Sequence, residues 1–212
     1  MDIIDPAISS YAEEFTSHEP DYLRELNRET YANVLMPRML SGHLQGRFFS
    51  MLSKMIRPKN ILEIGTYTGY SAICFSEGLT SDGQLHTIDI NDELAPLVKS
   101  YILKAGMENR IITHYGDAIK IIPSLSGPFD IVFIDADKIN YSLYFDLVID
   151  KVSNGGYIIA DNVLWDGKVL KPDKSDKDTL AIHQFNKKIQ NDNRVENVLV
   201  TIRDGVMVIR KK

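Results

Sequence analysis

Residues 60–71, Asn-Ile-Leu-Glu-Ile-Gly-Thr-Tyr-Thr-Gly-Tyr-Ser, contain the pattern that decides the fold. The first five form a short apolar run that ends at Gly65, which is typical of a buried strand. A helix is expected to follow from about Tyr70 to Glu77. Gly65 and Gly69 let the backbone approach a ligand closely at the start of that helix, although glycine in such a turn is also purely structural in many sheets. The stretch predicts one strand–turn–helix unit of an α/β sheet.

Four further apolar runs follow along the chain, at residues 85–88, 111–113, 131–134 and 157–160. The segment between the first two of these runs, residues 94–105, places apolar side chains three and four positions apart, as in an amphipathic helix. Gly106 stands where such a helix commonly ends. Alternating helices and continuously apolar strands predict a parallel sheet that is covered on both faces.

The end of the chain has a different pattern. Residues 195–202 and 206–209 flank Arg203-Asp204-Gly205, which is typical of an antiparallel hairpin with a tight Asp-Gly turn. The predicted fold class is therefore α/β, a Rossmann-like, doubly wound, seven-stranded mixed sheet with a C-terminal antiparallel hairpin. Residues 1–57 are predicted to form an N-terminal helical cap and residues 58–212 the core, in one domain overall. Ligands of such sheets bind beyond the carboxyl ends of the strands.

The composition excludes several classes of protein. A chain of 212 residues fits one domain. Lys and Arg number 24 against 29 Asp and Glu, and the net charge of -5 disfavours a nucleic-acid partner. The single cysteine, Cys74, excludes an intramolecular disulfide and a cysteine-based zinc site. The acidic start lacks the features of a signal peptide, and no stretch approaches the ~20 apolar residues of a membrane span. We expect a cytoplasmic protein with no membrane partner.

Polar residues follow the first three predicted strands. The turn after the first has neither the G-x-G-x-x-G spacing of a dinucleotide-binding turn nor the lysine of a phosphate-binding loop. Asp89 follows the second strand, where an acid can accept hydrogen bonds from both hydroxyls of a ribose; a helix cap or a solvated loop acid is the alternative. Gly116-Asp117-Ala118 follows the third strand and could frame an adenine ring.

The fourth and fifth strands end in acids, at Asp135-Ala136-Asp137-Lys138 and at Asp161-Asn162. Acids at adjacent strand ends repel one another without a counter-charge. A divalent cation would resolve the repulsion, and two carboxylates with one amide suit Mg²⁺, Mn²⁺ or Ca²⁺ rather than zinc. Lys138 alone could instead neutralise one carboxylate. The histidines show no paired metal-ligand spacing and are predicted to be surface or packing residues: His18, His43, His86, His114 and His183.

Three segments together resemble a known family. They are residues 63–71, residues 130–141 (DIVFIDADKINY) and residues 155–167 (GGYIIADNVLWDG). In this order they are similar to the cation-dependent class I S-adenosylmethionine O-methyltransferases, which include caffeoyl-CoA and catechol O-methyltransferases. The similarity runs from roughly Glu19 to the C-terminus. It implies S-adenosylmethionine bound over the first three strand ends, a divalent metal such as Mg²⁺, a small phenolic acceptor and a homodimer.

The resemblance also implies roles for individual residues. The cofactor would be bound by Ser41, Glu63, Gly65, Thr66, Tyr67, Ser71, Asp89, Asp117, Ala118 and Asp135. The metal would be held by Asp135, Asp161 and Asn162, and Lys138 would act as the general base. The acceptor would be bordered by Asp137, Trp165 and Asp166; for the two aspartates, helix capping and loop solvation are the alternatives.

These residue types suit methyl transfer to a catechol-like acceptor. A phenol has a pKa near 10 and is a poor nucleophile at neutral pH, and chelation of Mg²⁺ by two vicinal hydroxyls would lower that pKa. Other readings are a cofactor-binding module without catalysis, a methyltransferase with a non-catechol acceptor such as a nucleic acid or a protein, and a nicotinamide-dependent oxidoreductase. The last is disfavoured by the missing glycine fingerprint.

Overall fold

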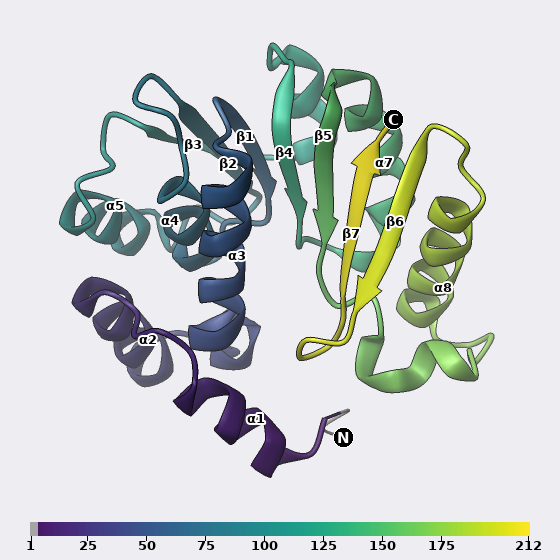
Figure 1. Ribbon diagram of the computed structural model, residues 1–212, viewed down its shortest axis with the longest axis horizontal. Helices are drawn as coiled ribbons and strands as arrows, with labels where there is room; N and C mark the ends of the chain where they lie inside the picture. Colours follow the sequence, from purple (N-terminus) through teal and green to yellow (C-terminus); the bar gives the residue numbers. More distant parts are fainter. Residues whose placement is uncertain (1–3) are drawn as a thin grey trace.

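The computed structural model describes residues 4–212. Its centre is one sheet of seven strands in the order β3-β2-β1-β4-β5-β7-β6 (Figure 1). The strands are β1 (Asn60–Ile64), β2 (Gln84–Asp89), β3 (Ile111–Tyr115), β4 (Phe129–Ile134), β5 (Val152–Ala160), β6 (Val195–Val200) and β7 (Val206–Lys211). The first five are parallel, and β7 lies antiparallel between β5 and β6. This arrangement confirms the predicted mixed sheet.

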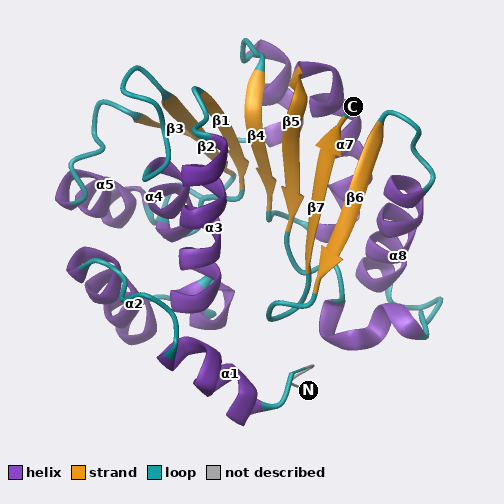
Figure 2. Ribbon diagram, in the orientation of Figure 1, coloured by secondary structure: helices purple, strands orange, loops and turns teal. Residues whose placement is uncertain are grey.

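Helices cover both faces of the sheet (Figure 2). The α-helices are α1 (Pro6–Glu14), α2 (Asp21–Asn33), α3 (Gly42–Ile56), α4 (Tyr70–Ser76), α5 (Ala95–Lys104), α6 (Ala118–Ile121), α7 (Tyr141–Val148) and α8 (Lys177–Gln190). Short 3₁₀ helices are η1 (Pro37–Met39), η2 (Ile122–Ser124), η3 (Lys138–Asn140), η4 (Ile149–Lys151) and η5 (Trp165–Leu170). Residues of α2 to α5 pack into one core, and residues of α7 and α8 pack into the other.

Alternate residues of the central strands divide the core into these two layers. On β4, Ile131 and Phe133 face the first layer, while Val132 and Ile134 face the second. All four side chains are fully buried, which contributes about 1.5–3 kcal/mol each relative to exposure. A strand buried on both faces therefore appears in the sequence as an unbroken apolar run.

The N-terminal helices pack along one side of the α3–α5 layer. The Tyr101 hydroxyl on α5 donates a 2.6 Å hydrogen bond to Glu29 on α2, and the Tyr70 hydroxyl on α4 donates to Glu19. The first three residues of the predicted cap, which carry part of the acidic start, lie outside the described residues. Within residues 4–212, no helix combines the length and hydropathy that a membrane crossing requires.

The predicted C-terminal antiparallel hairpin is confirmed, and Gly205 N donates to Ile202 O at 2.9 Å in a turn at its tip, but the prediction of a two-residue Asp-Gly turn is wrong. Strand β6 ends at Val200 and β7 begins at Val206, so five residues connect them. Arg203 and Gly205 have positive φ angles of 49° and 83°, whereas Asp204 does not, and the two-residue type I′ turn would need two adjacent positive values. The longer loop is bound to another segment: Leu164 N donates to Asp204 O at 2.9 Å, and Val163 N donates to Gly205 O at 3.1 Å.

Candidate active site

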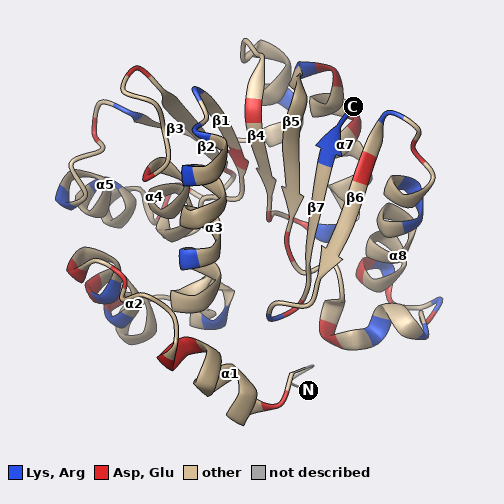
Figure 3. Cartoon of the chain, viewed as in Figure 1, with Lys and Arg blue, Asp and Glu red and all other residues tan. Residues whose placement is uncertain are grey.

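The candidate site lies beyond the carboxyl ends of β1, β4 and β5. Backbone hydrogen bonding continues one residue past each strand: Gly65 N donates to Ile88 O, Asp135 N to Ile64 O and Asp161 N to Ile134 O, at 2.8–3.0 Å. The residues that follow these strands are therefore fixed side by side. From β1 the chain continues to β2 on one side, and β4 lies on the other side, so this edge is the switch point where open α/β sheets bind ligands. Figure 3 shows acidic positions just past the ends of β4 and β5.

Gly65 has no room for a side chain. A Cβ added at this position would lie 2.1 Å from the Asp135 carbonyl oxygen, and the φ angle of 105° disfavours any other residue. The close approach of the β1 and β4 ends therefore requires glycine here, whatever ligand binds nearby.

Gly65→Ala is expected to lower the free energy of unfolding by at least about 3 kcal/mol, because backbone strain and a clash with backbone atoms act together. Gly106→Ala is the matched control, since Gly106 also has a positive φ of 68° but a Cβ there would meet nothing within 4 Å. It should cost only about 1 kcal/mol. Urea denaturation measures both, and equal losses would contradict the role given to the Asp135 contact.

Asp89 organises the turn after β1. Its Oδ2 accepts hydrogen bonds from the backbone N–H of Tyr67 at 2.7 Å and of Thr66 at 3.1 Å, and its Oδ1 accepts from Asn91 N at 2.9 Å. The carboxylate thus fixes the turn at Tyr67, whose φ is 49°. Loop organisation is therefore a role that Asp89 has in this structure, and its predicted bonds to a ribose stay a prediction.

Glu63 is fully buried at the end of β1. Its carboxyl accepts hydrogen bonds from the hydroxyls of Ser71, at 2.6 Å, and Thr87, at 2.5 Å. Burial raises the pKa of Glu63 to about 8, and the two hydroxyls oppose that shift. A cationic group placed beside this carboxyl would favour its ionised form.

One cavity joins the turn after β1 to the segment before α3. It is lined by predicted cofactor residues, namely Ser41, Gly65, Thr66, Tyr67, Ser71 and Asp135, together with Met39, Leu40, Thr68 and Tyr70. Thr68 is fully buried, and its hydroxyl has no hydrogen-bond partner within residues 4–212. Asp117 and Ala118 do not line this cavity: Ala118 begins α6, and the Asp117 side chain caps that helix by accepting from Ile119 N at 2.9 Å.

The Lys138 ammonium lies among oxygens of the predicted metal set. Its Nζ donates to Asp135 Oδ1 at 2.9 Å, to Asn162 Oδ1 at 2.8 Å and to the Tyr141 hydroxyl at 2.7 Å. Burial raises the pKa of Asp135 to about 6; Lys138 opposes this shift, and Asp161 adds to it. Burial alone would lower the pKa of Lys138, but Asp135 and Tyr141 raise it above its usual value. The lysine is therefore a cation held by two of the three predicted metal ligands.

Asp161 and Asn162 complete this group of oxygens. Asp161 is 3% exposed, and its Oδ1 accepts from Asn162 N at 2.8 Å. Asn162 has a φ of 55°, a left-handed conformation that its side chain tolerates. The two carboxylates of Asp135 and Asp161 and the amide oxygen of Asn162 are donors that fit a hard divalent cation. Asp135 and Asn162 already bind one positive group, the Lys138 ammonium. Within residues 4–212 there is no group of three or more His, Cys, Asp or Glu side chains able to hold a metal.

The predicted acceptor residues fall into two groups. Trp165 lies next to the lysine, with Lys138 Nζ 5.8 Å from its ring centroid, and its buried indole N–H has no partner in the described part of the chain. Asp137 instead accepts from Asn140 Nδ2 at 2.6 Å and from the Tyr144 hydroxyl. The Asp166 backbone N–H donates to Asp204 Oδ1 at 2.6 Å. The bonds of Asp137 involve its carboxylate, whereas the bond of Asp166 involves only its backbone, and a substrate role stays a prediction for all three residues.

Several polar groups of the site were not predicted from the sequence. Tyr141 could have been suspected, because it lies three residues after Lys138 and its hydroxyl also donates to Asp161 O at 3.0 Å. Thr87 interrupts an apolar run, which is a weak signal. Nothing in the sequence pattern indicates a role for Arg203, although its guanidinium contacts Leu40, just before α3, and Gln45, in its first turn. His86 and His114 form an unpredicted pair, Nδ1 to Nε2 at 2.9 Å, on adjacent strands.

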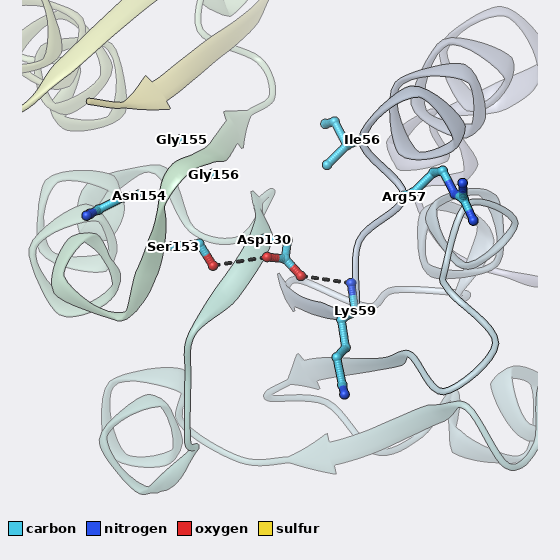
Figure 4. Close-up of a pocket in the computed structure, with 8 residues that line it drawn as sticks. All are labelled: Ile56, Arg57, Lys59, Asp130, Ser153, Asn154, Gly155 and Gly156. Atoms are coloured by element: carbon cyan, nitrogen blue, oxygen red, sulfur yellow. Dashed lines mark hydrogen bonds between the residues drawn. The ribbon is translucent and has the colours of Figure 1, made fainter.

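A second cavity lies at the opposite, amino-terminal end of the strands and contains none of the predicted site residues (Figure 4). Asp130 at its centre accepts from Lys59 N at 2.8 Å and from Ser153 Oγ at 3.0 Å. These bonds join the starts of β1, β4 and β5, so the carboxylate of Asp130 stabilises this end of the sheet.

Together, the strand order, the glycine turn at the switch point and the acidic edge beside it define an α/β fold that carries a site for a small cofactor. Residues 13–212 match the family model described as O-methyltransferase, and the chain belongs to this family. It is an S-adenosylmethionine-dependent O-methyltransferase, which confirms the class implied by the sequence motifs.

Relatives of known name support this assignment. The caffeoyl-CoA O-methyltransferase of Mesembryanthemum crystallinum is 36% identical over 205 residues, which cover 91% of this chain and 80% of that protein. The enzyme of the same name from Petroselinum crispum is 35% identical over 205 residues, which cover 91% of this chain and 85% of that protein. The O-methyltransferase from Bacillus cereus, solved in complex with SAH, superposes with a TM-score of 0.90 at 29% identity and covers 97% of both chains.

Proposed function

We propose that this enzyme methylates a hydroxyl of a small vicinal-dihydroxy aromatic molecule and requires a divalent metal. The observation that carries the proposal is the convergence of Asp135 and Asn162 on Lys138: the ammonium nitrogen lies 2.9 Å from Asp135 Oδ1 and 2.8 Å from Asn162 Oδ1. Asp135 and Asn162 would hold the metal with Asp161. The caffeoyl-CoA O-methyltransferases among the relatives support an acceptor of this class by their names.

The described residues have distinct parts in this chemistry. When bound, the metal supplies Lewis acidity toward a phenol, and the cofactor supplies an electrophilic methyl group. The buried carboxyl of Glu63 and the turn held by Asp89 orient the cofactor from the β1 side. The Trp165 ring lies beside the lysine, 5.8 Å from its Nζ, and would border the acceptor on that side. Since charge is neutralised as the methyl group moves, the protein contributes chiefly by positioning.

Lys138 is the group that can take the proton. In the structure, Asp135 and Asn162 hold it as an ammonium. If these oxygens bound a divalent cation instead, Lys138 would lose two of its three acceptors and would face a positive charge. Its pKa would then fall toward the range that a general base needs.

A methyl-transfer assay over a panel of catechols tests the function. We expect turnover with Mg²⁺, a loss of at least about 100-fold in excess EDTA, and recovery when Mg²⁺ is restored. Monophenols of similar size are the control, since they cannot chelate through two hydroxyls. Full turnover in EDTA would contradict the metal requirement, and methylation of monophenols but not catechols would contradict the acceptor class.

We further propose a homodimer, as the family resemblance implies. Helix α1 supports this proposal, because Ile8 and Tyr11 on the helix and Phe15 directly after it are 61%, 62% and 70% exposed. A sedimentation experiment that finds only monomers would overturn it.

A further inference from the structure

The loop between β6 and β7 reaches across the fold to the segment before α3. Arg203 Nη1 donates to Leu40 O at 2.7 Å, to Ser41 O and to Gln45 Oε1 at 3.0 Å, while its Nη2 donates to Arg38 O at 3.1 Å. One guanidinium therefore joins four oxygens that lie about 160 positions away in the sequence. Arginine suits this contact because its donors form a rigid planar fork.

The segment that Arg203 holds forms part of the cofactor cavity. Met39, Leu40 and Ser41 line that cavity together with Gly65 and Thr66. We call residues 38–41 the lid segment. Its regular structure is limited to the end of the short helix η1, α3 begins directly after it, and Arg38 and Met39 are exposed. The residues just before the lid segment are held by the Tyr67 hydroxyl, which lies 3.0 Å from Leu35 O and 3.3 Å from Met36 O.

The base of this contact is itself fixed. Leu164 N donates to Asp204 O at 2.9 Å, and Asp166 N donates to Asp204 Oδ1 at 2.6 Å. Gly205 packs against Leu164, whose side chain would lie 2.5 Å from an added Cβ. The hairpin loop is thus bound to the segment that follows Asp161 and Asn162, and Arg203 extends from it to the lid segment.

Backbone conformation gives an independent indication of a role. Arg203 has a φ of 49°, a left-handed value that favours glycine or asparagine and is unfavourable for arginine. A long, charged residue at a position better suited to glycine is accounted for here by its side-chain contacts.

We propose that Arg203 is a positioning residue that fastens the lid segment over the cofactor cavity. Arg203 would act through the lid segment and not by touching the reacting atoms. It lowers the freedom of residues 38–41 before the cofactor binds, so that less ordering is required on binding. The proposal depends on cofactor binding by this enzyme class and not on the metal or the catechol, so a failed catechol assay leaves it standing.

The test is binding of S-adenosylhomocysteine by calorimetry, without metal or acceptor, combined with hydrogen exchange of the lid amides. We expect Arg203→Ala and Arg203→Gly to raise Kd about tenfold and Arg203→Lys to give an intermediate value, since hydrogen bonds from a charged donor are lost in whole or in part. Exchange should accelerate in residues 38–41 but not in α7. Arg203→Gly also removes the left-handed strain, so weaker binding in a variant of undiminished Tm would separate positioning from general stability.

Arg210→Ala is the matched control. Arg210 is on the same hairpin and pairs with Glu196 at 2.8 Å near the other end of the strand, so its variant should bind like the parent protein. Unchanged Kd and unchanged lid exchange in Arg203→Gly would overturn the proposal. Acceleration of exchange spread evenly over the whole chain would overturn it as well, because it would show only a general loss of stability.

Discussion

Asp161→Asn is expected to lower metal-dependent turnover by at least about 100-fold and to weaken Mn²⁺ binding by a similar factor. Asp161 is buried at the end of β5, and its backbone N–H is fixed to Ile134 O at 3.0 Å, so the substitution removes a negative charge with little change in shape. The metal set would retain one carboxylate and two amides, a weaker donor set for a hard divalent cation.

Cofactor affinity should change little in the same variant, because Asp161 does not line the cavity formed by Ser41, Gly65 and Thr66. Calorimetry with S-adenosylhomocysteine and titration with Mn²⁺ measure the two affinities separately. Asp146→Asn is a matched control, since Asp146 is half exposed on α7 and pairs with Lys188. Equal loss of cofactor and metal affinity would contradict the separation of the two sites.

The sheet was predictable because burial on both faces produces unbroken apolar runs. Ile131 to Ile134 and the runs before Gly65 and Asp89 needed no tertiary information. The acidic group was predictable for a related reason: Asp135 and Asp161 each follow a parallel strand, and the carboxyl ends of parallel neighbours meet at one edge.

The contacts that were missed depend on register or on distant segments. The pairing of His86 with His114 follows from the alignment of β2 with β3, which the residue pattern does not reveal. The hairpin turn was predicted wrongly because its true form depends on hydrogen bonds from the segment at Leu164. Arg203 binds oxygens about 160 positions away, and no local propensity encodes such a contact.

Lys138→Met is expected to lower kcat about 10²–10⁴-fold near neutral pH, the range for loss of a general acid–base group. Methionine keeps an unbranched apolar side chain in a site that is 11% exposed, but it cannot hold a proton. The defect should shrink as the pH rises toward 10, because the phenol then loses its proton without help. A pH–rate profile measures this convergence, and a deficit of constant size from pH 7 to 10 would contradict the general-base role.

The same substitution separates the base from a purely structural counter-charge. Lys138 occupies Asp135 Oδ1 and Asn162 Oδ1, the oxygens proposed to bind the metal. On the proposed mechanism, Lys138→Met should therefore bind Mn²⁺ at least as tightly as the parent enzyme while turning over far more slowly. If the lysine served only to neutralise Asp135, metal binding would replace that function, and turnover at saturating Mg²⁺ would be nearly normal. Lys104→Met, at an exposed pair with Glu25, provides the control for loss of a lysine elsewhere and should leave kcat within about twofold of the parent value.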